Sequence, residues 1–163
     1  MRLRGIFVSM ATVGLVAAPA FAHGILSTVV NAGPNCTITG SAADDTLTGT
    51  TRDDVICSRA GQDLVSGLEG NDTIRLGQGS DTGGGDDGSD VVKGQADDDV
   101  VSGGDQNDTV YGGQGDDNDV SGDDGDDLVK TKDNVSGNDT AAGGIGTDTC
   151  RIDAGDIVIS CEL

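Results

Sequence analysis

The sequence has 163 residues and a net charge of -20, and 28 of its residues are glycine. Aromatic residues make up only 2% of it and tryptophan is absent, so the chain cannot bury a broad hydrophobic core. The negative charge argues against a nucleic-acid or anionic-membrane partner, because phosphates attract lysine and arginine, and it favours cations as partners.

The first 22 residues have the pattern of a secretory signal peptide. Arg2 and Arg4 precede an apolar run over residues 5–18, and residues 20–22 (Ala-Phe-Ala) form an A-x-A cleavage site. The apolar run is too short and too rich in small residues for a membrane anchor, and no later stretch is long enough to span a bilayer. We therefore expect a secreted, extracellular protein that begins at residue 23 and has no membrane span.

The rest of the chain is dominated by a nine-residue repeat, Gly-Gly-x-Gly-x-Asp-x-apolar-x, which runs from residue 40 to residue 151 and is clearest at residues 143–151. The first nine of its twelve units are contiguous; one extra residue is expected near residues 120–121 and about three at residues 131–133. Position eight is mostly apolar, with Gly83 and Asp119 as exceptions. All twelve units keep aspartate at position six: Asp45, Asp54, Asp63, Asp72, Asp81, Asp90, Asp99, Asp108, Asp117, Asp127, Asp139 and Asp148.

Each unit has two halves with different conformational preferences. Gly-Gly-x-Gly-x-Asp favours a turn, because glycine tolerates positive φ, and x-apolar-x predicts a very short strand with one side chain pointing inward. Two units then make a coil of 18 residues, and stacked coils give an all-β molecule with two parallel sheets and a thin core of position-eight residues. We expect a lead-in over residues 23–39, the repeat domain over 40–151 and a closing cap over 152–163.

The four cysteines, Cys36, Cys57, Cys150 and Cys161, lie in two pairs at the ends of the repeat. An even number in an exported chain predicts disulfides, and four cysteines allow three connectivities. If the repeats stack, at about 4.8 Å per coil, the two pairs lie roughly 20 Å or more apart. A disulfide requires Cα atoms within about 7 Å, which leaves only Cys36–Cys57 and Cys150–Cys161. Cys36 would take the aspartate place in a degenerate copy over residues 31–39.

Stacking also predicts a metal site between the turns. Each turn contributes a carboxylate and main-chain carbonyls, which repel one another unless a cation lies between them. Calcium takes 6–8 oxygen ligands, carbonyls included, whereas magnesium demands stricter geometry and releases water reluctantly. Zinc would require cysteine or histidine ligands, and the one histidine, His23, lies at the expected cleavage site.

The units resemble the RTX, or haemolysin-type, calcium-binding nonapeptide, which forms a right-handed parallel β-roll. The resemblance implies several Ca2+ ions, held by the position-six aspartates and by main-chain carbonyls of the glycine-rich turns. The resemblance is strongest in the units that match at both glycine positions. Asp45 and Asp54 lie in degenerate end turns, outside the expected ligand set. The expected metal-binding residues are Asp63, Asp72, Asp81, Asp90, Asp99, Asp108, Asp117, Asp127, Asp139 and Asp148, with Gly67, Gly70, Gly85, Gly88, Gly112, Gly115, Gly143 and Gly146.

Two features depart from typical members of that family. Such proteins leave the cell by a C-terminal signal and often carry a toxin, protease or lipase domain, whereas we expect an N-terminal signal and no such domain here. The flanking cysteine pairs resemble small secreted actinobacterial members.

Several other interpretations compete with the β-roll. Acidic disorder is expected when calcium is absent. An EF-hand is excluded because its loop needs a glutamate at position twelve, and the chain has only Glu69 and Glu162. An enzyme is not expected, because there is no aromatic or apolar residue set to line a pocket. A structural or adhesive surface module remains an alternative, with Arg75, Lys93 and Tyr111 as candidate contacts for a protein or surface partner that is unknown.

Overall fold

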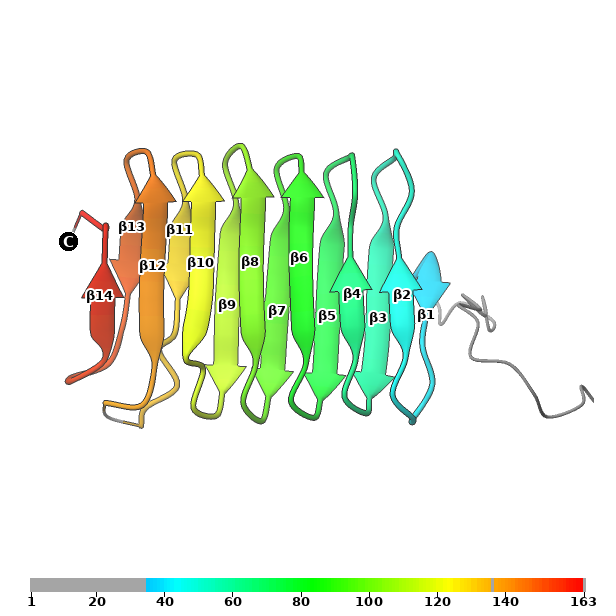
Figure 1. Ribbon diagram of the computed structural model, residues 1–163, viewed down its shortest axis with the longest axis horizontal. Helices are drawn as coiled ribbons and strands as arrows, with labels where there is room; N and C mark the ends of the chain where they lie inside the picture. Colours follow the sequence, from blue (N-terminus) through cyan, green and yellow to red (C-terminus); the bar gives the residue numbers. More distant parts are fainter. Residues whose placement is uncertain (1–34, 136, 163) are drawn as a thin grey trace, which may run out of the picture.

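The computed structural model describes residues 35–135 and 137–162, which form a parallel β-solenoid of about seven turns (Figure 1). None of the described segments forms a helix that is long and apolar enough to cross a membrane. The expected signal peptide and its cleavage site lie outside the described residues, as does most of the lead-in.

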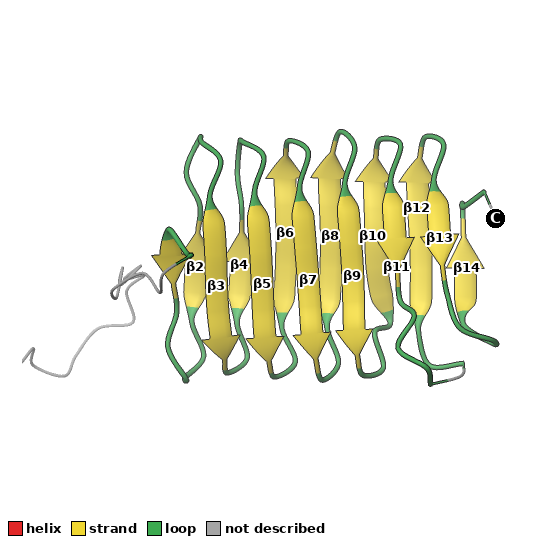
Figure 2. Cartoon of the chain, turned by 180° about the vertical axis from the view of Figure 1, so that it is seen from behind, coloured by secondary structure: helices red, strands yellow, loops and turns green. Residues whose placement is uncertain are grey.

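Two seven-stranded sheets face each other across the core, and the chain alternates between them (Figures 1 and 2). Sheet A contains β1 (Ile38–Thr39), β3 (Val55–Ala60), β5 (Thr73–Gln78), β7 (Val91–Ala96), β9 (Thr109–Gln114), β11 (Leu128–Lys130) and β13 (Thr149–Arg151). Sheet B contains β2 (Thr46–Thr48), β4 (Leu64–Ser66), β6 (Thr82–Asp87), β8 (Val100–Asp105), β10 (Asp119–Asp124), β12 (Thr140–Ile145) and β14 (Ile157–Ile159). Every strand pairs in parallel with the next strand of its own sheet, and Ile74 lies opposite Val92, which confirms the predicted coil of 18 residues.

The central strands are longer than the sequence predicted. β5 and β6 each contain six residues and are joined by residues 79–81 alone. Positions one to three of the units that follow such strands, predicted to be part of the turn, therefore belong to a strand. Their backbone groups pair with the neighbouring coils, as Gly77 does with Gln95, so the sheet overrides the local turn preference of glycine.

The core is a thin layer between the two sheets and consists mainly of the position-eight side chains, such as Ile56, Ile74 and Val92. Gly83 breaks this series, and the space that it leaves is filled by Leu76, which is fully buried at position one of the same unit. A side chain added at Gly83 would collide with the Leu76 side chain. Leucine and glycine have thus exchanged places within one unit, and the volume of the core is kept.

The two irregular spacings lie at slightly different places from those predicted. Val120, rather than Asp119, is fully buried and pairs with Val101, so the extra residue is Asn118 rather than one near residues 120–121. Thr131 is also fully buried and donates its N–H to the carbonyl of Arg151. It continues the coil, and the second insertion therefore falls within the turn that follows it.

Disulfides close both ends of the solenoid, with the predicted pairing. Cys36 bonds to Cys57 and Cys150 bonds to Cys161, and the Cα–Cα distances are 6.1 and 5.8 Å. Ile38 lies opposite Ile56, which aligns Cys36 with the aspartate position of the next coil in sheet A.

Candidate calcium-binding turns

Stacking sorts the position-six aspartates into two ladders, one along each edge of the solenoid. In each ladder an aspartate lies one coil from the next, because the strands that follow them pair in register. The first ladder, in the turns that lead into sheet B, contains Asp45, Asp63, Asp81, Asp99, Asp117 and Asp139. The second ladder, in the turns that lead into sheet A, contains Asp54, Asp72, Asp90, Asp108, Asp127 and Asp148.

The two oxygens of each carboxylate have different surroundings. From Asp63 onward, Oδ1 accepts a hydrogen bond from the backbone N–H of the aspartate one coil earlier, as Asp90 does from Asp72 at 2.6 Å and Asp108 does from Asp90 at 2.7 Å. Oδ2 is buried and has no hydrogen-bond partner in ten of the twelve aspartates: Asp63, Asp72, Asp81, Asp90, Asp99, Asp108, Asp117, Asp127, Asp139 and Asp148. A buried carboxylate oxygen without a partner is costly, so a repeated series of them fits a row of binding sites for a positively charged ligand.

The glycine at position one forms the wall of this arrangement. A side chain at Gly85 would overlap with Oδ2 of Asp90 and with the carbonyl oxygen of Gly103 in the next coil. The same overlap occurs at Gly67, Gly94, Gly103, Gly122 and Gly143. The orphaned carboxylate oxygen and a main-chain carbonyl therefore converge on a space that only glycine leaves open.

The second ladder keeps this space more consistently than the first. All its units have glycine at position one, whereas Ser58, Leu76 and Thr131 occupy that place in the units of Asp63, Asp81 and Asp139 of the first ladder. Gly112 in the first ladder still lies against Oδ2 of Asp117.

The position-four glycines have a different role. Gly70, Gly88, Gly115 and Gly146 all have positive φ, between 122° and 153°, where the chain turns from one sheet to the other. Their Cα atoms also lie against the preceding coil: a side chain at Gly88 would overlap with the carbonyl oxygen of Gly70.

Burial raises the pKa of many of these carboxyl groups and so makes them weaker acids than usual. Removal from water raises the pKa of Asp99 and Asp108 to about 7, opposed by the hydrogen bond from the preceding coil and reinforced by neighbouring carboxylates. Burial likewise raises the pKa of Asp72, Asp81 and Asp139 to about 6. The pKa values of Asp90, Asp117 and Asp127 are raised for the same reason.

The donor set suits calcium better than other common metals. Within residues 35–135 and 137–162, no three carboxylate, imidazole or thiol groups converge on one point. A cation bound there must draw most of its ligands from main-chain carbonyls, as calcium does and zinc does not. All four cysteines are in disulfides, so they supply no thiolate.

The two end turns are satisfied without a metal. Oδ2 of Asp45 accepts hydrogen bonds from the N–H and hydroxyl of Ser41 at 2.6 and 2.9 Å, and Oδ2 of Asp54 accepts them from Thr50 at 2.8 and 2.7 Å. Burial alone would raise the pKa of Asp54, but the hydrogen bonds from Thr50 and Thr37 bring it below its usual value. The degenerate motif predicted that these two aspartates lie outside the ligand set, but it did not reveal the role of the hydroxyl residue at position two.

Other residues that the sequence did not single out extend the ladders. Glu162 ends the second ladder, where its Oε2 accepts the N–H of Asp148 at 2.6 Å. Asparagine and aspartate at position five form an outer series, in which Asn71 accepts the N–H of Ser89 and Asp98 accepts that of Asp116, both at 2.9 Å. The frequent aspartate and asparagine residues at position five are the feature of the sequence from which this series could have been predicted.

Comparison with known proteins identifies the repeat. The family model of the RTX calcium-binding nonapeptide repeat matches four times, over residues 39–74, 48–82, 84–119 and 136–156, which together cover more than half of the chain. The chain belongs to the RTX calcium-binding nonapeptide repeat family. It is a calcium-binding β-roll protein, and the RTX β-roll is a non-catalytic type of fold. No curated protein matches the chain.

Proposed function

We propose that this RTX protein is secreted and folds when Ca2+ binds between its stacked turns. The unpartnered, buried Oδ2 atoms of ten aspartates carry the proposal. Without a cation, each is a desolvated carboxylate next to others of the same charge, so the folded state is unfavourable at neutral pH. Calcium supplies the missing partner, and its binding free energy becomes folding free energy.

The ligands in this proposal are the ten aspartates with an unpartnered Oδ2 and main-chain carbonyl groups of the glycine-rich segments, as expected from the sequence. The aspartates hold the cation through Oδ2, while Oδ1 keeps consecutive coils in register through its hydrogen bond. Gly67, Gly85, Gly112 and Gly143 keep the space beside Oδ2 open. The second ladder is the stronger set, because every one of its units has glycine at position one.

Secretion fits the same mechanism. RTX repeats and disulfides are typical of extracellular proteins, and calcium at about 10⁻⁴–10⁻³ M, as required by extracellular modules, is available only outside the cell. The chain would remain unfolded before export and fold afterwards. We expect no enzymatic activity.

The ligand assignment is tested by Asp90→Asn, which keeps the size of the side chain and the Oδ1 acceptor but removes the carboxylate charge. We expect fewer bound calcium ions by equilibrium dialysis and a calcium midpoint raised about tenfold, since charge-assisted contacts contribute about 1.5–3 kcal/mol. Asp45→Asn is the matched control, because Ser41 already satisfies Oδ2 of Asp45. Equal stoichiometry and affinity in Asp90→Asn and the unmodified protein would refute the assignment.

A further inference from the structure

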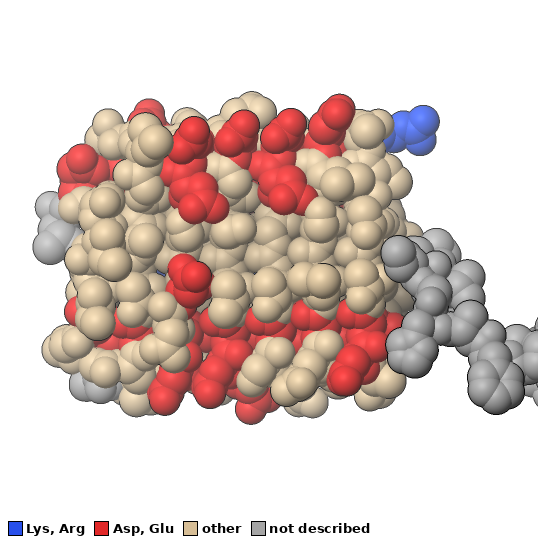
Figure 3. Space-filling model, in the orientation of Figure 1, with Lys and Arg blue, Asp and Glu red and all other residues tan. Residues whose placement is uncertain are grey.

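Basic residues are gathered on one face of this acidic protein. Six of the seven lysine and arginine residues in the described part of the chain lie in sheet A or directly after it: Arg59, Arg75, Lys93, Lys130, Lys132 and Arg151. The opposite face, sheet B, carries acidic groups along its edges and no basic group over its strands (Figure 3). The positive charge is therefore concentrated on the outer surface of sheet A.

Four of these residues form one straight row together with a tyrosine, and we call this row the basic stripe: Arg75, Lys93, Tyr111, Lys130 and Arg151. They occupy position nine of successive coils and lie opposite one another across β5, β7, β9, β11 and β13. Position nine points outward, because its two neighbours in each strand are buried. The row runs along the solenoid axis with one side chain about every 4.8 Å.

Across the residues that the structure describes, no carboxylate of the protein neutralises this row. Like charges placed opposite each other on adjacent strands, such as Arg75 and Lys93, are destabilising. Among the described residues the only ion pair is Lys132–Asp153 at 3.4 Å, which lies outside the stripe. The cations of the stripe are therefore free to meet an external anion.

Tyr111 holds two of these cations in place. The Nζ atoms of Lys93 and Lys130 lie 5.2 and 4.3 Å from the centre of its ring, and Lys130 also donates a hydrogen bond to the tyrosine hydroxyl at 2.9 Å. These contacts reduce the conformational freedom that the lysines would lose on binding a ligand.

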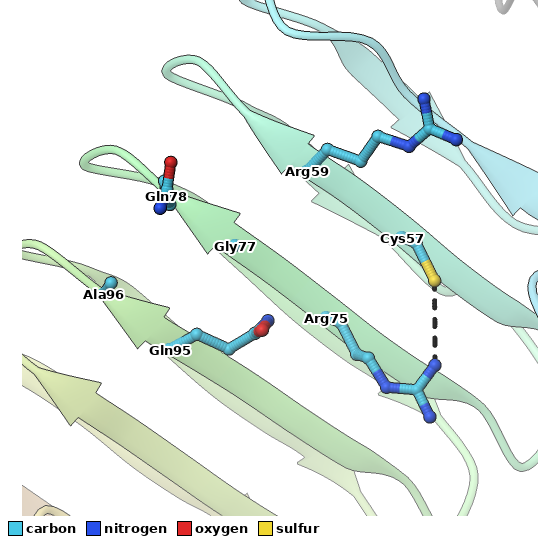
Figure 4. Close-up of a pocket in the computed structure, with 7 residues that line it drawn as sticks. All are labelled: Cys57, Arg59, Arg75, Gly77, Gln78, Gln95 and Ala96. Carbon is cyan, nitrogen blue, oxygen red and sulfur yellow. Dashed lines mark hydrogen bonds between the residues drawn. The ribbon is translucent and has the colours of Figure 1, made fainter. Parts of the chain in front are cut away.

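Two hollows lie beside the stripe, where glycine at position two leaves no side chain. The first, of about 380 Å³, is formed at Gly77 with Arg59, Arg75 and Gln95 around it (Figure 4). The second, of about 410 Å³, is formed at Gly113, with Lys130, Lys132 and Arg151 among its lining residues. Each hollow is flanked by at least two cations and is large enough for an anionic group of a ligand.

We propose that the basic stripe binds a single chain of an anionic polysaccharide, which lies along the solenoid axis and places carboxylate or sulfate groups in the two hollows. The shape of the positive surface favours this ligand over wider polyanions. The six-residue strands are about 20 Å long, so the exposed carboxylates of both turn edges lie roughly 10 Å from the stripe. A narrow chain stays about one Debye length from those edges, whereas a membrane surface or a nucleic-acid duplex would press against them.

This binding depends on the folded face rather than on the calcium ligands, and it goes beyond the calcium-dependent folding proposed above. Calcium assists it indirectly, because bound cations reduce the negative field of the turn edges. It also names a ligand class for the alternative function, that of an adhesive surface module.

The proposal is tested by fluorescence anisotropy with labelled polysaccharides, using the oxidised protein in millimolar calcium. Dextran sulfate and hyaluronate separate sulfate from carboxylate recognition, and unmodified dextran is the neutral control. We expect binding of at least one anionic polymer and none of dextran. The double variant Lys93→Gln/Lys130→Gln should weaken binding about tenfold and reduce the salt dependence, because fewer counterions are released. Arg52→Gln is the control, because it removes a cation that lies outside sheet A and away from the stripe, and this variant should bind as the unmodified protein does.

Other outcomes would overturn the proposal. Equal binding by the double variant would mean that calcium bridges the polymer to the acidic turns. Tighter, stripe-dependent binding of single-stranded oligo(dT) or of anionic phospholipid vesicles would assign the stripe to a different partner. Circular dichroism separates the two proposals: a disordered chain in calcium removes both, whereas a β-rich chain without stripe-dependent binding removes only this one.

Discussion

At the scale of single residues, the glycines at positions one and four of the repeat are needed for different reasons. Position four has positive φ in most units, as in Gly88 at 146°, and position one requires the absence of a side chain, as beside Asp90. The first reason follows from the chemistry of glycine alone and was predicted. The second depends on where the carboxylate of Asp90 points, which no local pattern in the sequence reveals.

Gly85→Ala tests the second constraint. The added methyl group would overlap with Oδ2 of Asp90 and the carbonyl of Gly103, so we expect the free energy of unfolding in calcium to fall by about 1–3 kcal/mol. Urea unfolding followed by circular dichroism measures it. The neighbouring Gly84→Ala is the control, because its methyl group would meet only the side chains of Ser102 and Asp86, at 3.0 and 3.6 Å. If the two variants are equally stable, position one is not a wall of the site.

At the scale of strands and turns, the sequence determines the coil but not its details. The nine-residue period and the alternation of sheets were predictable, because aspartate recurs at position six in all twelve units. Strand length was not, since Gly-Gly-x favours a turn in isolation and becomes a strand only when neighbouring coils supply its hydrogen bonds. The exchange of Leu76 and Gly83 likewise becomes visible only when both side-chain positions face the same core.

The ends of the solenoid show the same limit. The disulfide pairing followed from distance alone, because the two cysteine pairs lie at opposite ends of the stack. The groups that close the ladders did not, since Thr50 and Glu162 act through contacts that a degenerate repeat does not display. Thr50 replaces glycine in a degenerate unit and Glu162 lies beyond the last unit, so the periodicity gives no information about the contacts of either residue.

At the scale of the whole molecule, stability without calcium should depend strongly on pH. The pKa values of Asp99 and Asp108 are raised to about 7 in the folded state, against about 3.9 in an unfolded chain. The folded state thus holds more protons than the unfolded state between these values. The stability that these protonated carboxyl groups contribute to the folded state is fully present below about pH 4 and is lost as the pH rises through about 7.

We therefore expect the metal-free protein in chelator to show more β-structure at pH 4.5 than at pH 7.5. Protonation at low pH also reduces the net charge of -20, which acts in the same direction. Calcium affinity should fall over the same pH range, because protons and calcium compete for the same carboxylates. Far-UV circular dichroism, with light scattering to exclude aggregates, measures the first effect. A β-content that is equal at both pH values, or higher at pH 7.5, would show that the buried carboxyl groups do not govern folding.

The most direct test of metal-coupled folding is a far-UV circular dichroism titration of the oxidised protein at neutral pH, with calcium and separately with magnesium. We predict a change from a disordered to a β-rich spectrum with calcium alone, reversed by chelator, because the buried Oδ2 atoms need a cation that accepts many carbonyl ligands. A spectrum that remains disordered up to tens of millimolar calcium, or a protein already β-rich at neutral pH in chelator, would contradict it.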